Sequence, residues 1–321
     1  MTKPPLPSLL AFIISALLSS VASSADDIVI VGGEGVDCIK DPGCVNRLHP
    51  DIPMAARAKP GQTILFRARD ARDVLGAAAA QTTEPDTLTN EFGRVHPITG
   101  PVYIEGAVAG DVLKVTLNNI DPGSYAYTSG GSSGFIPDLV GGQSLVIWRL
   151  NRDYAESDDL PGIRIPNGSF PGVVTTMPGR NQLRVMLDRE QELADAGGRV
   201  SLPSADFADP AALCGPGGSA TSDCLRTIPP REHGGNMDIR YLKAGVSIYL
   251  PCFIDGCGLA IGDLHYAQGD GEVSGTAIEM SADVWATTEV LKNGPDLSRG
   301  PHYEGSAQLL DIPSRRFYAV T

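Results

Sequence analysis

The chain has 321 residues, of which 42% are hydrophobic and only 6% aromatic, which provides enough apolar material for one large core or two small ones. Its 37 glycines and 25 prolines predict many turns and few long helices. The formal net charge of -13 at pH 7 disfavours binding to nucleic acid and to anionic membrane surfaces, so we expect neither as a partner.

The amino-terminal 25 residues have the pattern of a signal peptide. Lys3 supplies a short basic region, residues 9–21 form an apolar run too short to span a bilayer, and small residues ending at Ala25 suit a cleavage site. We therefore expect residues 1–25 to be removed, leaving residues 26–321 as a single domain that is secreted or periplasmic and not held at a membrane. An uncleaved membrane anchor is the alternative interpretation.

The six cysteines fall into three close pairs along the sequence. Their spacing favours the disulfides Cys38–Cys44, Cys214–Cys224 and Cys252–Cys257, each of which closes a short loop and stabilises the fold by about 2–3 kcal/mol. A catalytic or metal-binding thiol is the competing interpretation. It is disfavoured because the sequence has no Cys-x-x-Cys motif and an oxidising compartment favours disulfides.

A first candidate functional cluster lies at residues 46–53. His49 and Asp51 are two residues apart, and Pro50 biases His49 toward an extended backbone. In an extended segment such residues share a face, so the two side chains are expected to point together. A surface histidine beside an aspartate is also common without any function.

The secondary structure is predicted to be mainly β. Apolar residues in alternating or continuous runs predict strands at residues 63–67, 112–120, 144–150, 246–250 and 277–286, and the third and fourth of these are expected to be buried. One helix is predicted at residues 181–196, where leucine and methionine recur at helical spacing before Gly197. Residues 203–230, rich in Pro, Gly, Ser and Ala, predict a long tethered loop, either an active-site flap or a lobe boundary.

A Gly-x-Ser-x-Gly pattern occurs around Ser132 and matches a nucleophile elbow. An elbow requires a strand before the serine and a helix after it. Pro137 follows closely, and no helical periodicity comes after it. A flexible glycine turn is the favoured interpretation, and a serine amidase that uses Ser132 is the weaker alternative.

The most informative segment is residues 262–272, which contain three carboxylates, an imidazole and a carboxamide. Asp263 and His265 are two residues apart, as are Asp270 and Glu272, so each pair shares a face of an extended chain. Glycines around the second pair allow tight turns that aim both pairs at one point. The alternative is a polar turn with solvated charges, but flanking apolar runs place the segment near a core.

Two His/Asp pairs from distant parts of the chain form an N/O ligand set. We expect His49, Asp51, Asp263 and His265 to bind a divalent ion, with zinc the first choice and a harder ion if carboxylates predominate.

Four segments also carry a family resemblance, and they occur in family order over most of the chain. These segments are HPDIP at 49–53, HPITGPVYIEGA at 96–107, GGNMDI at 234–239, and GDLHYAQGDGE at 262–272 followed by AIE at 277–279. Together they resemble the acetamidase/formamidase family. The resemblance implies a mainly β, sandwich-like fold with few helices, and hydrolysis of a carbon–nitrogen bond in a short linear amide, giving carboxylate and ammonia at a metal-bearing site.

The chemistry of amide hydrolysis suggests roles for four further residues. A carboxylate must carry a proton from water to the departing nitrogen, and Glu272 is the first candidate and Glu105 the second. Asn236 and Gln268 are candidates to hold the amide substrate by hydrogen bonds. For Glu105 the alternative is a turn residue, and His96 is equally well interpreted as a structural histidine at a strand end.

The sequence departs from the family pattern at three single positions and in one segment, where Leu75-Gly76 and an alanine run ending at Gln81 replace the Asp-Gly-Gln after the early strand. Leu139 and Phe170 stand where histidines are usual, and Arg240 stands where a lysine is usual; arginine keeps the charge but changes reach and pKa behaviour. The favoured interpretation is an exported amidohydrolase acting on a small amide. The alternative is a non-catalytic small-molecule-binding protein on the same scaffold, and a homo-oligomer is compatible with either.

Overall fold

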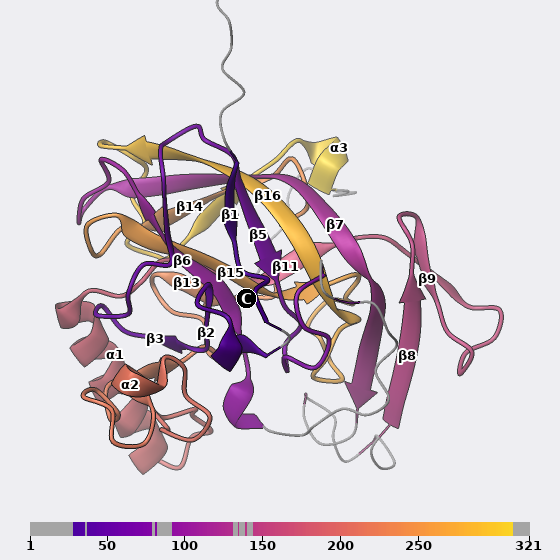
Figure 1. Cartoon of the computed structure of the whole chain (residues 1–321), viewed down its shortest axis with the longest axis horizontal. Coiled ribbons are helices and arrows are strands. Elements are labelled where there is room, and N and C mark those ends of the chain that lie inside the picture. The colour runs from indigo at the N-terminus through magenta and orange to yellow at the C-terminus, as the bar shows by residue number, and fades with distance from the viewer. Residues whose placement is uncertain are drawn as a thin grey trace, which may run out of the picture.

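Antiparallel strands dominate the structure, as the apolar runs predict. The computed structural model of the chain describes residues 28–35, 37–78, 81, 92–130, 134, 139 and 144–310. Within these ranges the strands form one branched 15-stranded sheet and one two-stranded sheet. Figure 1 shows the long strands β7 and β16 crossing the molecule, with α1 and α2 together on the opposite side from α3. The predicted mainly β fold class is confirmed.

The strands and helices have the following bounds. The strands are β1 (Val29–Val31), β2 (Cys44–Val45), β3 (Arg47–Leu48), β4 (Ala56–Ala58), β5 (Ile64–Ala68), β6 (Ile98–Ile104), β7 (Val112–Gly130), β8 (Ser144–Leu150), β9 (Tyr154–Glu156), β10 (Arg164–Pro166), β11 (Phe170–Thr175), β12 (Leu225–Arg226), β13 (Gly234–Asn236), β14 (Ser247–Pro251), β15 (Cys257–His265), β16 (Glu279–Leu291) and β17 (His302–Glu304). The helices are α1 (Arg180–Asp195), α2 (Ala211–Cys214) and α3 (Ala307–Leu310), and short 3-10 helices lie at Cys38–Lys40 and Phe92–Arg94.

The five predicted strands are present: the one at 144–150 has the predicted bounds as β8, the others have shifted ends, and the strand predicted at 112–120 continues to Gly130 as part of β7. The predicted burial of residues 144–150 is wrong. In β8 only Trp148 is buried, and Leu145 is 42% exposed. The reason is topological, because β8 lies outside β7 and is followed only by the short strands β9 and β10.

The helix α1 confirms the predicted helix and packs against a small second core. Leu183 and Met186 are buried there with Leu48 and Ile52, whereas Leu193, at the far end of the helix, is 52% exposed. The apolar stripe therefore packs α1 against the segment that carries His49.

The segment 203–230 is fastened to the early part of the chain. Its β12 pairs with β3, and the buried guanidinium of Arg47 donates hydrogen bonds to the carbonyl oxygens of Ser204 and Asp206, each at 2.9 Å. Burial of Cys214 and Cys224 with Ala208 and Ala220 gives the segment a small core of its own.

All three predicted disulfides are present: Cys38–Cys44, Cys214–Cys224 and Cys252–Cys257. No helix within the described ranges is both long and apolar enough to cross a membrane. The proposed signal segment and Ser132 lie outside those ranges.

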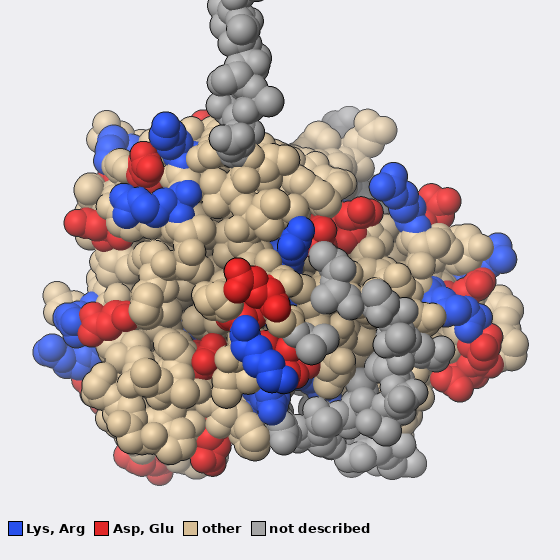
Figure 2. All heavy atoms as spheres, viewed as in Figure 1, with Lys and Arg blue, Asp and Glu red and all other residues tan. Residues whose placement is uncertain are grey.

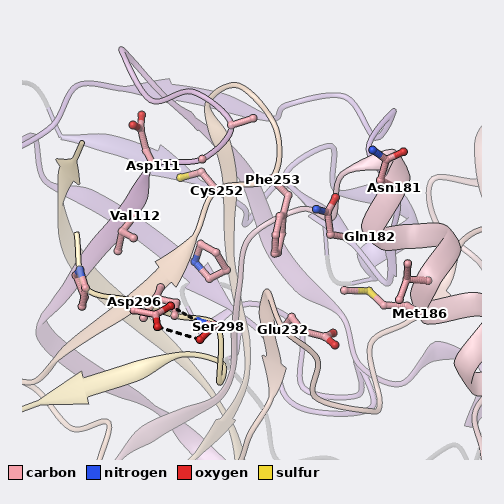
Figure 3. Close-up of a pocket in the computed structure, with 16 residues that line it drawn as sticks. Asp111, Val112, Asn181, Gln182, Met186, Glu232, Cys252, Phe253, Asp296 and Ser298 are labelled. Atoms are coloured by element: carbon pink, nitrogen blue, oxygen red, sulfur yellow. Dashed lines mark hydrogen bonds between the residues drawn. The ribbon is translucent and has the colours of Figure 1, made fainter. Parts of the chain in front are cut away.

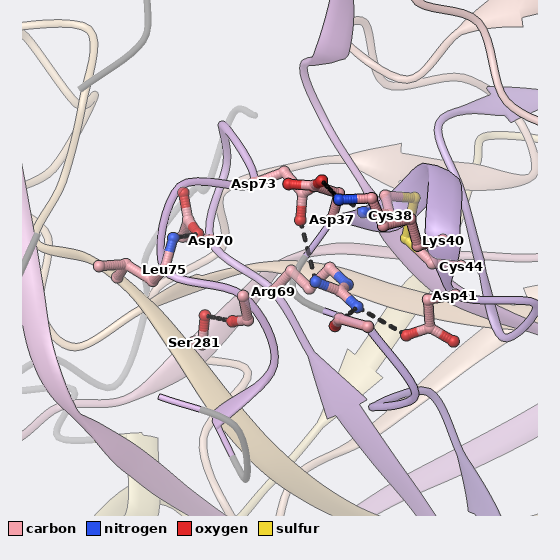
Figure 4. A network of polar contacts seen from close by, with 12 residues as sticks. Asp37, Cys38, Lys40, Asp41, Cys44, Arg69, Asp70, Asp73, Leu75 and Ser281 are labelled. Carbon is pink, nitrogen blue, oxygen red and sulfur yellow. Dashed lines mark hydrogen bonds and ion pairs between the residues drawn. A yellow bond between two sulfur atoms is a disulfide. The ribbon is translucent and has the colours of Figure 1, made fainter. Parts of the chain in front are cut away.

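A buried polar network fastens the amino-terminal segment to the sheet (Figure 4). The fully buried Arg69 pairs with Asp41 at 2.7 Å and with Asp73 at 3.0 Å. Burial raises the pKa of Asp73 to about 7, although Arg69 opposes the shift. Nearby, Tyr127 of β7 donates a hydrogen bond to Asp70 at 2.9 Å.

Charged side chains are spread over the surface. On the face shown in Figure 2, acidic side chains lie beside basic ones both at the margins and near the centre.

The strand β15 lies at the centre of the main core. Every one of its residues is buried, and its neighbours in the sheet include β11, β16 and β6. Polar side chains on β15 therefore lie in a low-dielectric environment, where an unpaired charge is costly.

Candidate metal and acid–base site

The candidate site is built around Asp263 and His265 of β15. The structure brings these side chains together, as their spacing predicts: His265 Nε2 lies 3.5 Å from Asp263 Oδ1, and both side chains are almost completely buried. Asp263 has a left-handed backbone (φ 55°), which locally interrupts the regular strand. The carboxylate and the imidazole thus lie close together from positions two residues apart.

Two glutamates approach His265 from the neighbouring strand and loop. Glu279 begins β16 directly opposite His265, and its Oε2 lies 3.3 Å from His265 Nε2. Glu272 Oε1 lies 3.9 Å from the same nitrogen, and its side chain is 20% exposed. Glu279 is only 2% exposed and accepts a hydrogen bond from the Ala277 amide, so Glu272 is the more accessible of the two.

Asp238 enters from the other side of His265, just after β13. Its Oδ1 lies 4.0 Å from His265 Nδ1. The amides of Met237 and Asp238 both donate to the carbonyl oxygen of Gly172 in β11, at 3.0 and 3.3 Å. Because β11 pairs with both β13 and β15, it fixes the Asp238 segment beside Asp263 and His265.

Gln268 bridges two parts of the site. Its Nε2 donates to the carbonyl oxygen of Asp238 at 3.2 Å, so its Oε1 is the acceptor for His265 Nδ1 at 2.8 Å. This assignment places a proton on Nδ1 and directs Nε2 of His265 toward Asp263 and Glu279. An imidazole whose other nitrogen is held in this way is typical of a metal ligand.

His96 completes the site from the segment before β6. Its Nε2 lies 3.7 Å from Asp263 Oδ2, and its Nδ1 is buried without a hydrogen-bond partner. The hydroxyl of Thr227 holds the backbone of His96, accepting from its amide at 2.6 Å and donating to its carbonyl at 3.0 Å. His96 therefore faces the site rather than only ending a strand.

Phe170 of β11 packs against the imidazole. The two rings are perpendicular, with centroids 5.1 Å apart, and Phe170 is fully buried. This edge-to-face contact limits rotation of His265 and excludes water from one side of it.

The charges of the site shift one another's pKa values. Burial by itself raises the pKa of Asp263, but the facing His96 and His265 outweigh it and lower the value. Burial likewise lowers the pKa of His265, but Glu279 and Asp263 raise it well above its usual range. Asp263 and His265 therefore form an ion pair in the protein without a bound metal.

Asp238 and Glu272 are shifted the opposite way from Asp263. Burial and the nearby Asp263 raise the pKa of Asp238 to about 6. Burial and the neighbouring Glu279 raise the pKa of Glu272 to about 9, despite the opposing effect of His265. Strongly perturbed carboxyl groups gathered in one place are typical of functional sites.

Backbone strain also concentrates here. Asp238, Asp263 and Glu272 all have left-handed backbones, with φ of 49°, 55° and 42°. Such conformations cost non-glycine residues about 1 kcal/mol or more, and they persist where the surrounding structure enforces them. All three of these residues have a carboxylate oxygen within 4.0 Å of a ring nitrogen of His265.

The donor set fits a divalent metal ion. Ligand atoms of Asp238, Asp263 and His265 lie within 4.8 Å of one another, as do those of His265, Glu272 and Glu279. Four buried atoms of these groups have no hydrogen-bond partner: Asp238 Oδ1, Asp263 Oδ1, His265 Nε2 and Glu279 Oε2. Unpaired buried oxygens beside an imidazole nitrogen form an N/O donor set of the kind that binds divalent ions.

The first predicted pair, His49 and Asp51, lies elsewhere. Asp51 pairs with Arg180 of α1 at 2.6 Å, and His49 lines a cavity beside the same helix. Among the described residues, neither belongs to a group of three or more potential ligands. The structure therefore does not bring the two His/Asp pairs together.

The remaining predicted residues divide between the site and the surface. Glu105 is exposed in the turn after β6, and the exposed Asp270 pairs with Arg240, with its Oδ1 3.4 Å from Arg240 Nε. Gln268 contacts His265, as described above. Asn236 ends β13, and its buried Oδ1 has no hydrogen-bond partner.

Sequence reasoning did not assign Asp238 and Glu279 to the site. Both residues lie inside the segments that carry the family resemblance, and that resemblance is the sequence feature that could have identified them. Neither has a histidine or second carboxylate two positions away, so a search for local pairs passes over them.

A cavity of about 670 Å³ lies apart from this site. It is lined by apolar residues such as Met186 and Phe253, together with Glu232 and Asp296 (Figure 3). None of the residues of the acidic site lines it. Burial, strain and unpaired atoms, rather than cavity size, distinguish the candidate site.

Comparison with known proteins gives consistent matches. The profile described as Acetamidase/Formamidase family matches residues 37–307. An acetamidase of Mycolicibacterium smegmatis is 33% identical over 276 residues, which cover 78% of this chain and 66% of that protein. A formamidase of Methylophilus methylotrophus is 32% identical over 265 residues, covering 78% of this chain and 64% of that protein. The chain thus spans slightly less than two thirds of the length of these relatives.

A solved structure also aligns closely. A gamma lactamase from Delftia acidovorans has a TM-score of 0.76 and 29% sequence identity, covering 87% of this chain and 72% of that one.

Proposed function

Because the chain belongs to the acetamidase/formamidase family, we propose that it hydrolyses the carbon–nitrogen bond of a small linear amide to a carboxylate and ammonia. The observation that carries the proposal is the group of Asp238, Asp263, His265, Glu272 and Glu279, in which four buried atoms have no hydrogen-bond partner.

Asp238, Asp263 and His265 are the proposed metal ligands, supported by their mutual proximity. A divalent ion bound there would polarise the amide carbonyl, lower the pKa of a water molecule and favour the ionised carboxylates. Gln268 keeps Nε2 of His265 free for this role, and Phe170 keeps the imidazole in place.

Glu272 is the proposed proton carrier. It is close to His265 but remains partly exposed, so it can reach both the substrate and the solvent. In the ionised form that a bound cation would favour, Glu272 would accept a proton from the attacking water and pass it to the leaving nitrogen as the carbon–nitrogen bond breaks. Water supplies the new oxygen of the carboxylate, and the nitrogen departs as ammonia.

Asn236 is the proposed substrate anchor. Its unpaired Oδ1 is a suitable acceptor for an amide N–H of the substrate. Gln268 cannot serve this role without giving up its bonds to His265 and Asp238, so we propose that it supports the site instead.

The test is ammonia release from formamide, acetamide and larger linear amides by purified protein, with and without added zinc. We expect metal-dependent turnover of at least one small amide. Absence of turnover on every amide in the presence of metal would favour the non-catalytic binding protein. Full activity of Ser132→Ala would eliminate the serine mechanism.

We also propose that the protein is exported. The three disulfides and the pattern of the first 25 residues support this. Amino-terminal sequencing of protein recovered outside the cytoplasm should begin at Asp26. A chain that retains Met1 in a reducing compartment would refute export.

A further inference from the structure

Gly172, in the middle of β11, lies against two proposed metal ligands, Asp238 and Asp263. A Cβ atom at this position would lie 2.6 Å from Asp238 Oδ1 and 2.7 Å from Asp263 Oδ2. It would also lie 3.0 Å from the carbonyl oxygen of Asp263. Contacts below 3.0 Å with a methyl group are repulsive, so any side chain here would displace at least one carboxylate.

The need for glycine does not come from the backbone of this residue. Gly172 is absent from the residues with left-handed φ, so alanine is compatible with its conformation. Asp238 and Asp263, in contrast, have left-handed backbones, and a carboxylate oxygen of each lies close to the position that a Gly172 side chain would take. Asp238 Oδ1, one of the atoms closest to the missing side chain, is buried and has no hydrogen-bond partner.

We propose that Gly172 is a positioning residue for the cation: the absence of its side chain keeps Asp238 and Asp263 close enough to bind one divalent ion. This inference rests on the metal-dependent function proposed above. Phe170, two residues earlier on the same strand, packs against the third ligand, His265. One face of β11 thus supports all three ligands. The ring of Phe170 packs against His265, and the absence of a side chain at Gly172 leaves room for the carboxylates of Asp238 and Asp263.

The experiment compares Zn²⁺ affinity of metal-stripped wild type, Gly172→Ala and Gly168→Ala, measured by calorimetry in the presence of a competing chelator. A Cβ at Gly168, just before the same strand, would have its nearest neighbours at 4.0 Å, so this variant is a matched control. Gly172→Ala should bind Zn²⁺ about 10–100-fold more weakly than wild type, whereas Gly168→Ala should bind Zn²⁺ as tightly as wild type.

The outcomes separate this inference from the proposed function. Equal affinity of Gly172→Ala and wild type would overturn the role of Gly172 while leaving the metal site in place. Failure of wild type to bind Zn²⁺ or any other divalent ion offered alone would overturn both.

A second measurement covers the case in which Gly172→Ala folds poorly. Thermal unfolding in chelator is compared for Gly172→Ala, Asp238→Ala and the double variant. If the methyl group collides with the Asp238 carboxylate, Gly172→Ala should lower the melting temperature less in the Asp238→Ala background than in wild type. Additive shifts would contradict the proposed contact.

Discussion

At the scale of single residues, the site combines groups whose protonation is set by burial and by one another. Asp263 and His265 stabilise each other as ions, whereas Glu272 and Asp238 are held toward the protonated form. This division is expected when several carboxyl groups share one site, because facing imidazoles favour the ionised form of Asp263, whereas burial and a neighbouring carboxylate favour the protonated forms of Asp238 and Glu272. It also leaves Glu272 as the group most suited to exchange a proton.

Glu272→Gln should lower turnover of the best amide by about 10²–10⁴-fold, because it keeps the shape of the side chain but removes the proton carrier. Ammonia release under saturating substrate measures the effect. Glu105→Gln is the control, since Glu105 is exposed in a turn, and it should retain wild-type turnover. Near wild-type activity of Glu272→Gln would exclude Glu272 as the carrier.

The stability of the metal-free protein should fall as pH rises from about 5 to 9. The pKa of Glu272 is raised to about 9 in the folded state, so between its unfolded value near 4.3 and about 9 the native state binds more protons than the unfolded state. Stability is therefore greatest at the acid end of this window, and each such group contributes a slope of at most about 1.4 kcal/mol per pH unit. Asp238, raised to about 6, acts in the same direction at lower pH.

Urea unfolding across this pH range in the presence of chelator measures that slope. Glu272→Gln should give a shallower decline than wild type, since glutamine does not titrate. Identical slopes for the two proteins would show that the folded-state pKa of Glu272 is not raised.

At the scale of elements, β15 and the strands that pair with it bring residues from distant sequence segments together in one site. The strand carries Asp263 and His265, β16 presents Glu279 directly opposite, and β11 links β15 to the segment with Asp238. The disulfide Cys252–Cys257 joins the end of β14 to the start of β15. The covalent link therefore anchors the strand on which the site depends.

Replacing both Cys252 and Cys257 by alanine should lower the free energy of unfolding by about 2–3 kcal/mol, because the short loop is no longer closed in the unfolded chain. Denaturant unfolding of the oxidised proteins measures the change. Wild type treated with reductant should approach the variant, and unchanged stability of the variant would show that this link contributes nothing to the fold.

At the scale of the whole molecule, the proposed ion should link ligand binding to global stability. A ligand that binds only the folded state at 100 times its Kd stabilises by about 2.7 kcal/mol. The site draws on segments from residue 96 to residue 279, so unfolding of the domain disrupts it. Ion binding should consequently be visible in the unfolding of the whole chain.

Added zinc should raise the melting temperature of metal-free wild type by several degrees, and His265→Ala should abolish the shift. His49→Ala is the matched control, since His49 lies beside α1 and outside both groups of potential ligands. Retention of the shift in His49→Ala would place the ion at the β15 site. Loss of the shift in His49→Ala but not in His265→Ala would instead restore the first His/Asp pair as ligands.

The sequence alone was sufficient for features that depend on local patterns. Apolar runs identified five of the strands, helical spacing identified α1, close spacing identified the disulfides, and the two-residue period of an extended chain paired Asp263 with His265. Each of these follows from geometry within a few residues, or from motifs long enough to reveal the family.

Tertiary structure decided which local patterns meet. His49 and Asp51 have the same spacing as Asp263 and His265, but strand order places them against α1, where Arg180 pairs with Asp51. Asp238 and Glu279 carry no local signal, and they reach His265 only because β11 and β16 flank β15. Spacing along a strand determines which side chains share a face, whereas strand pairing over long sequence separations determines what that face meets.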